Sequence, residues 1–130
     1  MNVGLLVITH NRIGEELIAT ARSILGNNIA PIQTISIPGE LDPADLGGYA
    51  DQIRDTIVDL TSKQSVLIFT DIYGATPNNL ARYFANDLNA EVVSGVNLPM
   101  LLRVLNYNQQ GLKQLLVTAI EGAKKGIVHG

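Results

Sequence analysis

The chain has 130 residues and no cysteine, with 46% hydrophobic residues, 16% charged residues and a formal net charge of −3. This length predicts a single domain over residues 1–130, and the apolar content is sufficient for a packed core and argues against disorder. The lack of cysteine excludes disulfides, thiolate metal ligands and cysteine nucleophiles, and the lack of a basic run gives no reason to expect nucleic acid as a partner.

The N-terminal half of the chain predicts two strands and two helices. Residues 3–8 are apolar, but the segment is short and lacks a basic leader, so it is interpreted as a buried strand and not as a signal peptide. A helix follows, because apolar residues from Ile13 to Leu25 recur on one face. A second strand at residues 32–37 is followed by the N-cap and first-turn proline Asp42-Pro43, which predict a helix with an apolar stripe through residue 60.

The C-terminal half continues this alternation. Residues 66–70 predict a third strand that is as apolar as the first. Thr76 and Pro77 repeat the start signal of a helix, with the Thr76 hydroxyl as its cap and the proline in its first turn. The remaining predicted elements are a strand at residues 91–94, a helix from Asn97 to about Leu105, a helix at residues 112–123 and a short C-terminal strand at residues 126–129.

Strands that alternate with helices predict an α/β fold with right-handed crossovers. We expect a mainly parallel, four-stranded, doubly wound sheet with helices on both faces. No apolar run approaches the roughly 20 residues needed to span a bilayer, so a cytoplasmic protein is expected. In such folds ligands bind beyond the carboxyl ends of the strands, so the site residues should follow the first, third and fourth strands.

His10 lies where the first predicted strand ends and the first helix is about to begin. A histidine in such a position is more commonly a loop residue or a helix cap than a reactive group. Imidazole is nevertheless a good nucleophile near neutral pH, and the N–H groups of the helix start favour the charge of a phosphate. His10 is therefore a candidate for accepting a phosphoryl group.

Asp71 follows the third predicted strand, which we expect to lie beside the first. Its ordinary interpretation is a turn or N-cap aspartate. Alternatively, its carboxylate accepts the Nδ1–H of His10, which leaves Nε2 free to attack phosphorus and stabilises the charged phosphohistidine. This is the role of the aspartate in a catalytic triad, used here without the serine.

Gly74 and Thr76 belong to the next helix start, whose backbone donors should face the same crevice. The Thr76 hydroxyl could donate to a phosphoryl oxygen. The segment lacks the lysine of a Walker motif, and the chain has no GxGxxG dinucleotide motif. Because the two histidines, His10 and His129, are far apart and cysteine is absent, we expect neither a metal nor an organic cofactor.

Three blocks together resemble the mannose-family IIA domains of the bacterial sugar phosphotransferase system. They are Thr9-His10, the segment from Asp71 to Asn79, and the segment from Gly95 to Met100, and the resemblance spans essentially the whole chain. It implies that His10 is phosphorylated by the phosphocarrier protein HPr and passes the phosphoryl group to a IIB component. It also implies that Asp71 pairs with this histidine.

The resemblance further implies a homodimer, in which the C-terminal strand is either exchanged between subunits or folded back on its own subunit, and contact with a membrane only indirectly through a permease complex. The chain departs from the family where Asn11 replaces the usual glycine; asparagine tolerates a left-handed conformation, so the turn can survive. Asn11, Gly74 and Thr76 are the predicted phosphate-binding residues. Three other interpretations stay open: a regulator whose phosphorylation state a partner senses, a dihydroxyacetone-kinase phosphodonor domain, and a generic flavodoxin-like ligand module.

Overall fold

The structure is a computed structural model that describes residues 3–130, and it contains a four-stranded sheet in the order β2-β1-β3-β4. All three strand pairings are parallel. The strands are β1 (Gly4–His10), β2 (Gln33–Ile37), β3 (Val66–Thr70) and β4 (Ala90–Val93). The predicted α/β fold with a four-stranded sheet is therefore confirmed.

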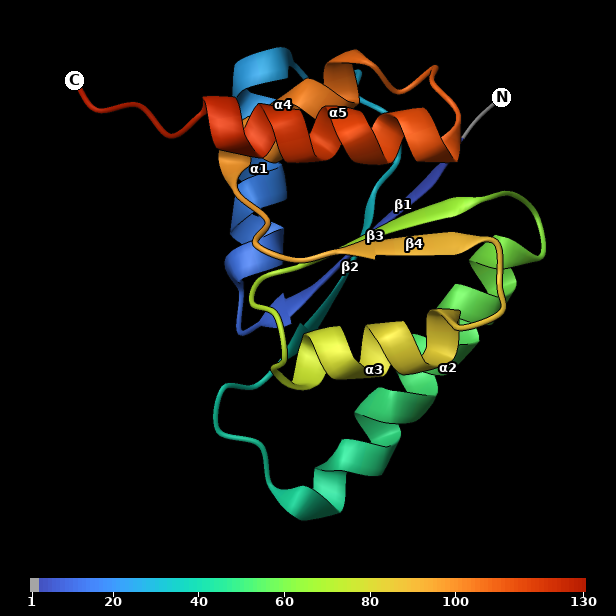
Figure 1. The fold of residues 1–130 in the computed structure, drawn as a ribbon. Coiled ribbons are helices and arrows are strands. Elements are labelled where there is room, and N and C mark those ends of the chain that lie inside the picture. The colour runs from blue at the N-terminus through green and yellow to red at the C-terminus, as the bar shows by residue number, and fades with distance from the viewer. Residues whose placement is uncertain (1–2) are drawn as a thin grey trace.

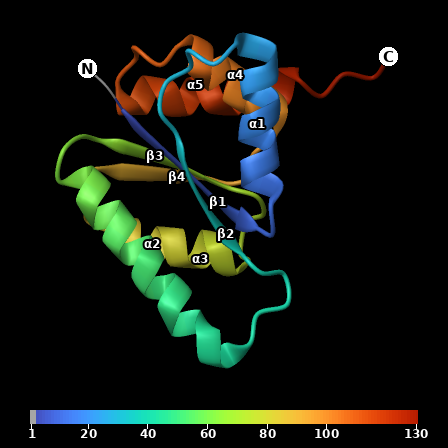
Figure 2. The same ribbon diagram turned by 180° about the vertical axis from the view of Figure 1, so that it is seen from behind.

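Helices cover both faces of this sheet, as Figures 1 and 2 show. One layer contains α1, α4 and α5, and the opposite layer contains α2 and α3. The helical elements are α1 (Ile13–Leu25), a 3-10 turn (Pro43–Asp45), α2 (Leu46–Thr61), α3 (Thr76–Ala85), α4 (Leu98–Asn106) and α5 (Leu112–Lys125). This is the doubly wound arrangement that the sequence predicts.

The central strands are almost continuously apolar because both of their faces are covered. In β1, Leu5 and Val7 pack with the α1, α4 and α5 layer, whereas Leu6 and Ile8 pack with the α2 and α3 layer. Successive side chains of a strand point to opposite faces, so a strand between two layers has apolar residues at most positions on both faces. The two resulting cores hold the carboxyl ends of β1 and β3 in place.

Two helix starts differ from the sequence-based prediction. Asp42 caps the 3-10 turn by accepting from the Ala44 N–H at 3.0 Å, and α2 itself begins only at Leu46. Thr76 is the first residue of α3 rather than its cap, since Ala75 occupies the N-cap position and no side chain caps this helix. The predicted capping role of the Thr76 hydroxyl is therefore wrong, because this hydroxyl lies in the first turn of α3 and makes no capping bond.

The short C-terminal strand predicted at residues 126–129 does not form in this chain, because Gly126 is in a turn and residues 127–130 have no regular structure. Figure 1 shows the tail leaving the end of α5 and pointing away from the sheet. Ile127 and Val128 are 79% and 78% exposed, so two apolar side chains lie uncovered in this chain. Across residues 3–130, none of the helices combines the length and the apolar character that crossing a bilayer would require.

Candidate functional site

The parallel pairing of β1 with β3 brings His10 and Asp71 to the same edge of the sheet. Ile8 lies opposite Thr70 in this pairing, His10 is the last residue of β1, and Asp71 follows β3 directly. In Figure 1 the loops that follow β1 and β3 and the starts of α1 and α3 gather on the left side of the molecule. This is the carboxyl edge, where doubly wound folds bind their ligands.

The side chains of His10 and Asp71 are in direct contact. The distance between His10 Nδ1 and Asp71 Oδ2 is 2.7 Å, and the same oxygen accepts from the His10 backbone N–H at 2.9 Å. The other carboxylate oxygen accepts from the Ile72 N–H at 3.1 Å. An ionised carboxylate only accepts hydrogen bonds, so this contact favours the tautomer with the proton on Nδ1 and the lone pair on Nε2.

The two partners differ in exposure. The histidine side chain is 31% exposed and the aspartate side chain is 11% exposed. The carboxylate is thus held inside the edge of the sheet, where three N–H groups surround it, while the imidazole reaches toward solvent. A ligand can therefore reach the ring from the solvent side without displacing Asp71.

Asn11 forms the turn between β1 and α1 and connects it to the loop after β2. Its backbone has a φ of 49°, the left-handed conformation that asparagine tolerates. Its N–H donates to the Ile37 carbonyl at 2.7 Å, and its side-chain Oδ1 accepts from the Gly39 N–H at 2.7 Å. Asn11 therefore presents only its side-chain Nδ2 group as a donor toward a ligand.

The loop between β3 and α3 is held by two consecutive asparagines. Gly74 has a φ of 85°; its N–H donates to Asn78 Oδ1 at 3.1 Å, and its carbonyl accepts from Asn79 Nδ2 at 2.8 Å. Asn78 is 1% exposed and also donates from Nδ2 to Thr70 Oγ1 at 3.0 Å. Gly74 thus uses its N–H within the loop, and the phosphate-binding roles of Gly74 and Thr76 stay predictions.

Another buried polar contact fixes the start of α1. Thr9 is fully buried, and its Oγ1 accepts from the Gly14 N–H at 2.9 Å. A Cβ at Gly14 would lie 2.8 Å from Val7 Cγ1, so the absence of a side chain lets α1 pack directly on β1. Sequence reasoning missed Thr9, Gly14 and Asn78, although a polar residue inside an apolar strand and paired asparagines in a first helical turn are visible signals.

Charged residues near His10 are paired with one another. Arg12 contacts Glu15 at 2.6 Å and Glu16 at 3.4 Å, and Ser36 Oγ donates to Glu15 Oε1 at 3.0 Å. The two glutamates also lie in the first turn of α1, where the helix dipole favours negative charge. Within residues 3–130, no group of three or more histidine, aspartate or glutamate side chains is placed to hold a metal ion.

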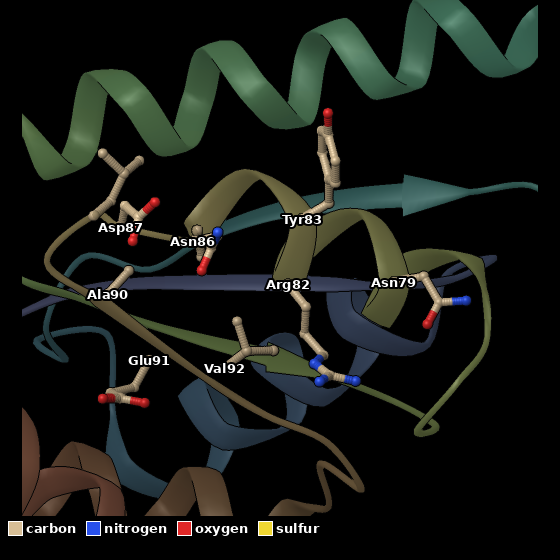
Figure 3. A pocket seen from close by; sticks show the side chains of 10 residues that line it. Asn79, Arg82, Tyr83, Asn86, Asp87, Ala90, Glu91 and Val92 are labelled. Atoms are coloured by element: carbon tan, nitrogen blue, oxygen red, sulfur yellow. The ribbon is translucent and has the colours of Figure 1, made fainter.

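An open groove lies elsewhere on the molecule, between α3 and the edge strand β4. Figure 3 shows Arg82 extending from α3 toward β4, with Asn79 and Glu91 also lining the groove. The groove is not lined by His10 or Asp71. The exposed histidine at the carboxyl edge and this groove are therefore separate features of the surface.

The protein is an α/β protein with a doubly wound parallel sheet. At the carboxyl edge of this sheet, the histidine that ends one central strand is bonded to the aspartate that follows its neighbour. A model of the family described as PTS system fructose IIA component matches residues 4–120. The chain belongs to this family of phosphotransferase-system IIA components, as the sequence blocks indicated.

Individual proteins with similar sequences are also phosphotransferase-system components. The chain is 29% identical over 132 residues to the PTS system mannose-specific EIIAB component of Escherichia coli (strain K12), covering 98% of this chain and 39% of that protein. It is 38% identical over 68 residues to the PTS system fructose-specific EIIA component of Bacillus subtilis (strain 168), covering 51% and 47% respectively. The chain thus spans about two fifths of the length of the Escherichia coli protein, and the aligned part covers less than half of the Bacillus subtilis protein.

A solved structure has the same fold. The mannose/sorbose specific IIA subunit of the phosphotransferase system from Enterococcus faecalis superposes with a TM-score of 0.86 at 22% identity, covering all of this chain and 96% of that one.

Proposed function

We propose that this chain is a phosphoryl carrier of a sugar phosphotransferase system. In this proposal His10 accepts a phosphoryl group from phospho-HPr and passes it to a IIB component. The observation that carries the proposal is the 2.7 Å contact between His10 Nδ1 and Asp71, which directs the lone pair of the ring to Nε2 on its solvent side. Family membership points to the same chemistry.

The reaction requires two in-line displacements at phosphorus. In the first, the Nε2 lone pair of His10 forms a bond to phosphorus while the bond from phosphorus to the donor breaks, and its electrons leave with the donor. The proton stays on Nδ1, so the ring becomes positively charged and the Asp71 carboxylate stabilises it. In the second, the nucleophile of the acceptor attacks phosphorus, and the electrons of the Nε2–P bond return to the ring.

The chain's own donors can hold the phosphoryl oxygens during these steps. Asn11 offers its side-chain Nδ2, and Thr76 offers its hydroxyl at the start of α3, where the helix dipole favours negative charge. Gly74, with its positive φ, shapes the loop that leads into Thr76. Neither displacement needs a metal or an organic cofactor.

The surface beside the site suits a protein donor. Ile72 and Tyr73 follow Asp71 and are 57% and 69% exposed, and Ile13 in the first turn of α1 is 45% exposed. Exposed apolar side chains beside a reactive group can pack against an apolar surface of a partner protein that presents its phosphoryl group there. Such docking is transient, because donor and acceptor must each leave after transfer.

The proposal includes a homodimer and a cytoplasmic location, with contact to a membrane only through a permease complex. β4 is the edge strand of the sheet beyond β3, and the groove in Figure 3 runs along it. The C-terminal tail carries the exposed apolar residues Ile127 and Val128, and an apolar tail of this kind can pair with an uncovered edge strand. Exchange of this tail between two copies would cover both features.

Incubation with enzyme I, HPr and phosphoenolpyruvate tests the carrier role. Intact mass should increase by one phosphoryl group per chain, and the label should be lost in acid and kept in base, as expected for phosphohistidine. His10→Ala should abolish the label, whereas His129→Ala, which changes the second histidine in the exposed tail, should keep it. A label that persists in His10→Ala rejects the assignment of His10.

A further inference from the structure

We propose that Asn78 is a positioning residue for the phosphoryl transfer, and that it acts by holding the loop that carries Asp71. This inference rests on the proposed carrier function. Asn78 lies in the first turn of α3 and is 1% exposed, so its amide group is removed from water. A buried amide without partners is costly, yet here both ends of the amide are bonded to the β3–α3 loop.

The two bonds join the two ends of that loop. Asn78 Nδ2 donates to Thr70 Oγ1 at 3.0 Å, on the last residue of β3, and Asn78 Oδ1 accepts from the Gly74 N–H at 3.1 Å. Asp71, Ile72 and Tyr73 lie between these anchors. The side chain of Asn78 therefore fixes the distance between Thr70 and Gly74, the two residues that flank the Asp71 segment.

The other contacts of this loop do not connect its two ends as Asn78 does. The backbone of Thr70 is fixed by its carbonyl, which accepts from the Val96 N–H at 3.0 Å, and Asn79 is bonded to the Gly74 carbonyl from an exposed position. Neither contact spans from β3 to the left-handed turn at Gly74. Without Asn78 that turn loses the acceptor of its N–H, and the Asp71 carboxylate has to hold His10 while its own loop can shift.

Small displacements of a reacting group slow catalysis strongly, since a shift of about 1 Å can lower a rate by about 100-fold. Partners that orient a functional side chain typically change activity by about 10–100-fold when removed. We therefore expect Asn78→Leu, which is close in size but has no amide, to slow phosphoryl transfer to His10 by about tenfold. The far-UV circular dichroism spectrum should stay that of the folded chain.

The state of the His10 ring provides a readout that a general loss of stability would not move. Long-range 1H–15N correlation spectra of the wild-type chain should show His10 protonated on Nδ1. In Asn78→Leu the spectra should show a mixture of Nδ1-H and Nε2-H tautomers. Thr118→Val is the matched control, because it removes another buried hydroxyl bond, from Thr118 Oγ1 to Gln110 at 2.6 Å, in the opposite helical layer. Its His10 spectrum and transfer rate should match the wild type.

A double-mutant cycle with Asp71→Ala tests whether Asn78 acts through Asp71. If it does, Asn78→Leu should slow transfer in the wild-type background and have little further effect when Asp71 is already absent. Thr70→Val, an isosteric change that breaks the Asn78–Thr70 bond alone, should shift the tautomer and the rate in the same direction by a smaller factor. This variant keeps the test decisive should Asn78→Leu fold poorly.

Wild-type rates and a wild-type His10 spectrum in Asn78→Leu and Thr70→Val would overturn the inference. So would a slowing that is equally large in the Asp71→Ala background, because Asn78 would then act by another route. These outcomes are distinct from failure of the carrier function, in which the wild-type chain itself takes up no phosphoryl group from HPr. The tautomer spectra test the positioning role in either case.

Discussion

Asp71 uses a single carboxylate oxygen to bind both the backbone and the ring of His10, at 2.9 and 2.7 Å. We predict that Asp71→Ala slows phosphoryl transfer to His10 by about 10–100-fold, because the ring loses the partner that fixes its tautomer and stabilises its charge. The fold should persist, since the carboxylate lies at the end of a strand and not within either apolar core. Rapid-quench labelling with phospho-HPr measures the rate, and circular dichroism checks the fold.

The matched control for Asp71→Ala is Asp59→Ala, which removes an exposed carboxylate of α2. Within residues 3–130, the only salt bridge of this carboxylate is with Lys63. Its transfer rate should equal that of the wild type. Normal transfer in Asp71→Ala itself would reduce Asp71 to a turn residue after β3.

At the scale of elements, the start of α1 depends on a bond from inside the sheet. Thr9 Oγ1 accepts from the Gly14 N–H at 2.9 Å and is fully buried. We predict that Thr9→Val lowers the free energy of unfolding by about 1–2 kcal/mol, because the isosteric valine leaves the Gly14 N–H without its acceptor. Urea unfolding followed by circular dichroism measures this difference.

Ser23→Ala serves as the control for Thr9→Val. Ser23 lies on the same helix, where its exposed hydroxyl donates to the Ala19 carbonyl at 3.1 Å. Exposed contacts of this kind change stability by about 0.5 kcal/mol or less. Equal stabilities of Thr9→Val and the wild type would show that α1 begins without help from Thr9.

The regular elements were largely predictable from the sequence because each has a strong periodic signal. The apolar runs of β1 and β3 stand out since both faces of these strands are buried, and the stripe of α1 marks its whole length. The first turns of α2 and α3 were less predictable. The same residues, an aspartate or threonine before proline, suit both a 3-10 turn and an α-helix start, and the fold selects between them.

The candidate site was predictable only in part. Parallel pairing of neighbouring strands places His10 beside Asp71, so strand order alone indicated their approach. The bond from Asn11 to Gly39 depends on the path of the loop after β2, and the bonds of Asn78 depend on how α3 docks on β3. No local pattern in the sequence records such contacts, because each joins segments whose relative position the whole fold determines.

At the scale of the whole molecule, the edge of β4 and the exposed tail predict a homodimer. Sedimentation equilibrium at micromolar concentration should give about twice the chain mass of 14.0 kDa. Truncation after Lys125 should weaken this dimer, because it removes Ile127 and Val128, whose apolar side chains are 79% and 78% exposed in the single chain.

A variant with Ile127 and Val128 both replaced by serine keeps the length of the tail and isolates the contribution of its apolar side chains. It should dimerise as weakly as the truncated chain. Monomers of the intact protein at these concentrations, or undiminished association after truncation, would contradict the exchange of the tail.

The bond between His10 and Asp71 joins residues that are 61 positions apart in the chain, one at the end of β1 and the other directly after β3. A register slip of one residue between β1 and β3 would turn the side chains to the opposite face and part the pair. The contact between His10 and Asp71 therefore forms only when β1 and β3 have paired in register. Under the proposed function, a chain in which these strands are unpaired or out of register would lack the oriented imidazole and should accept no phosphoryl group. Uptake of label by a refolding sample would accordingly count the molecules whose sheet is correctly assembled.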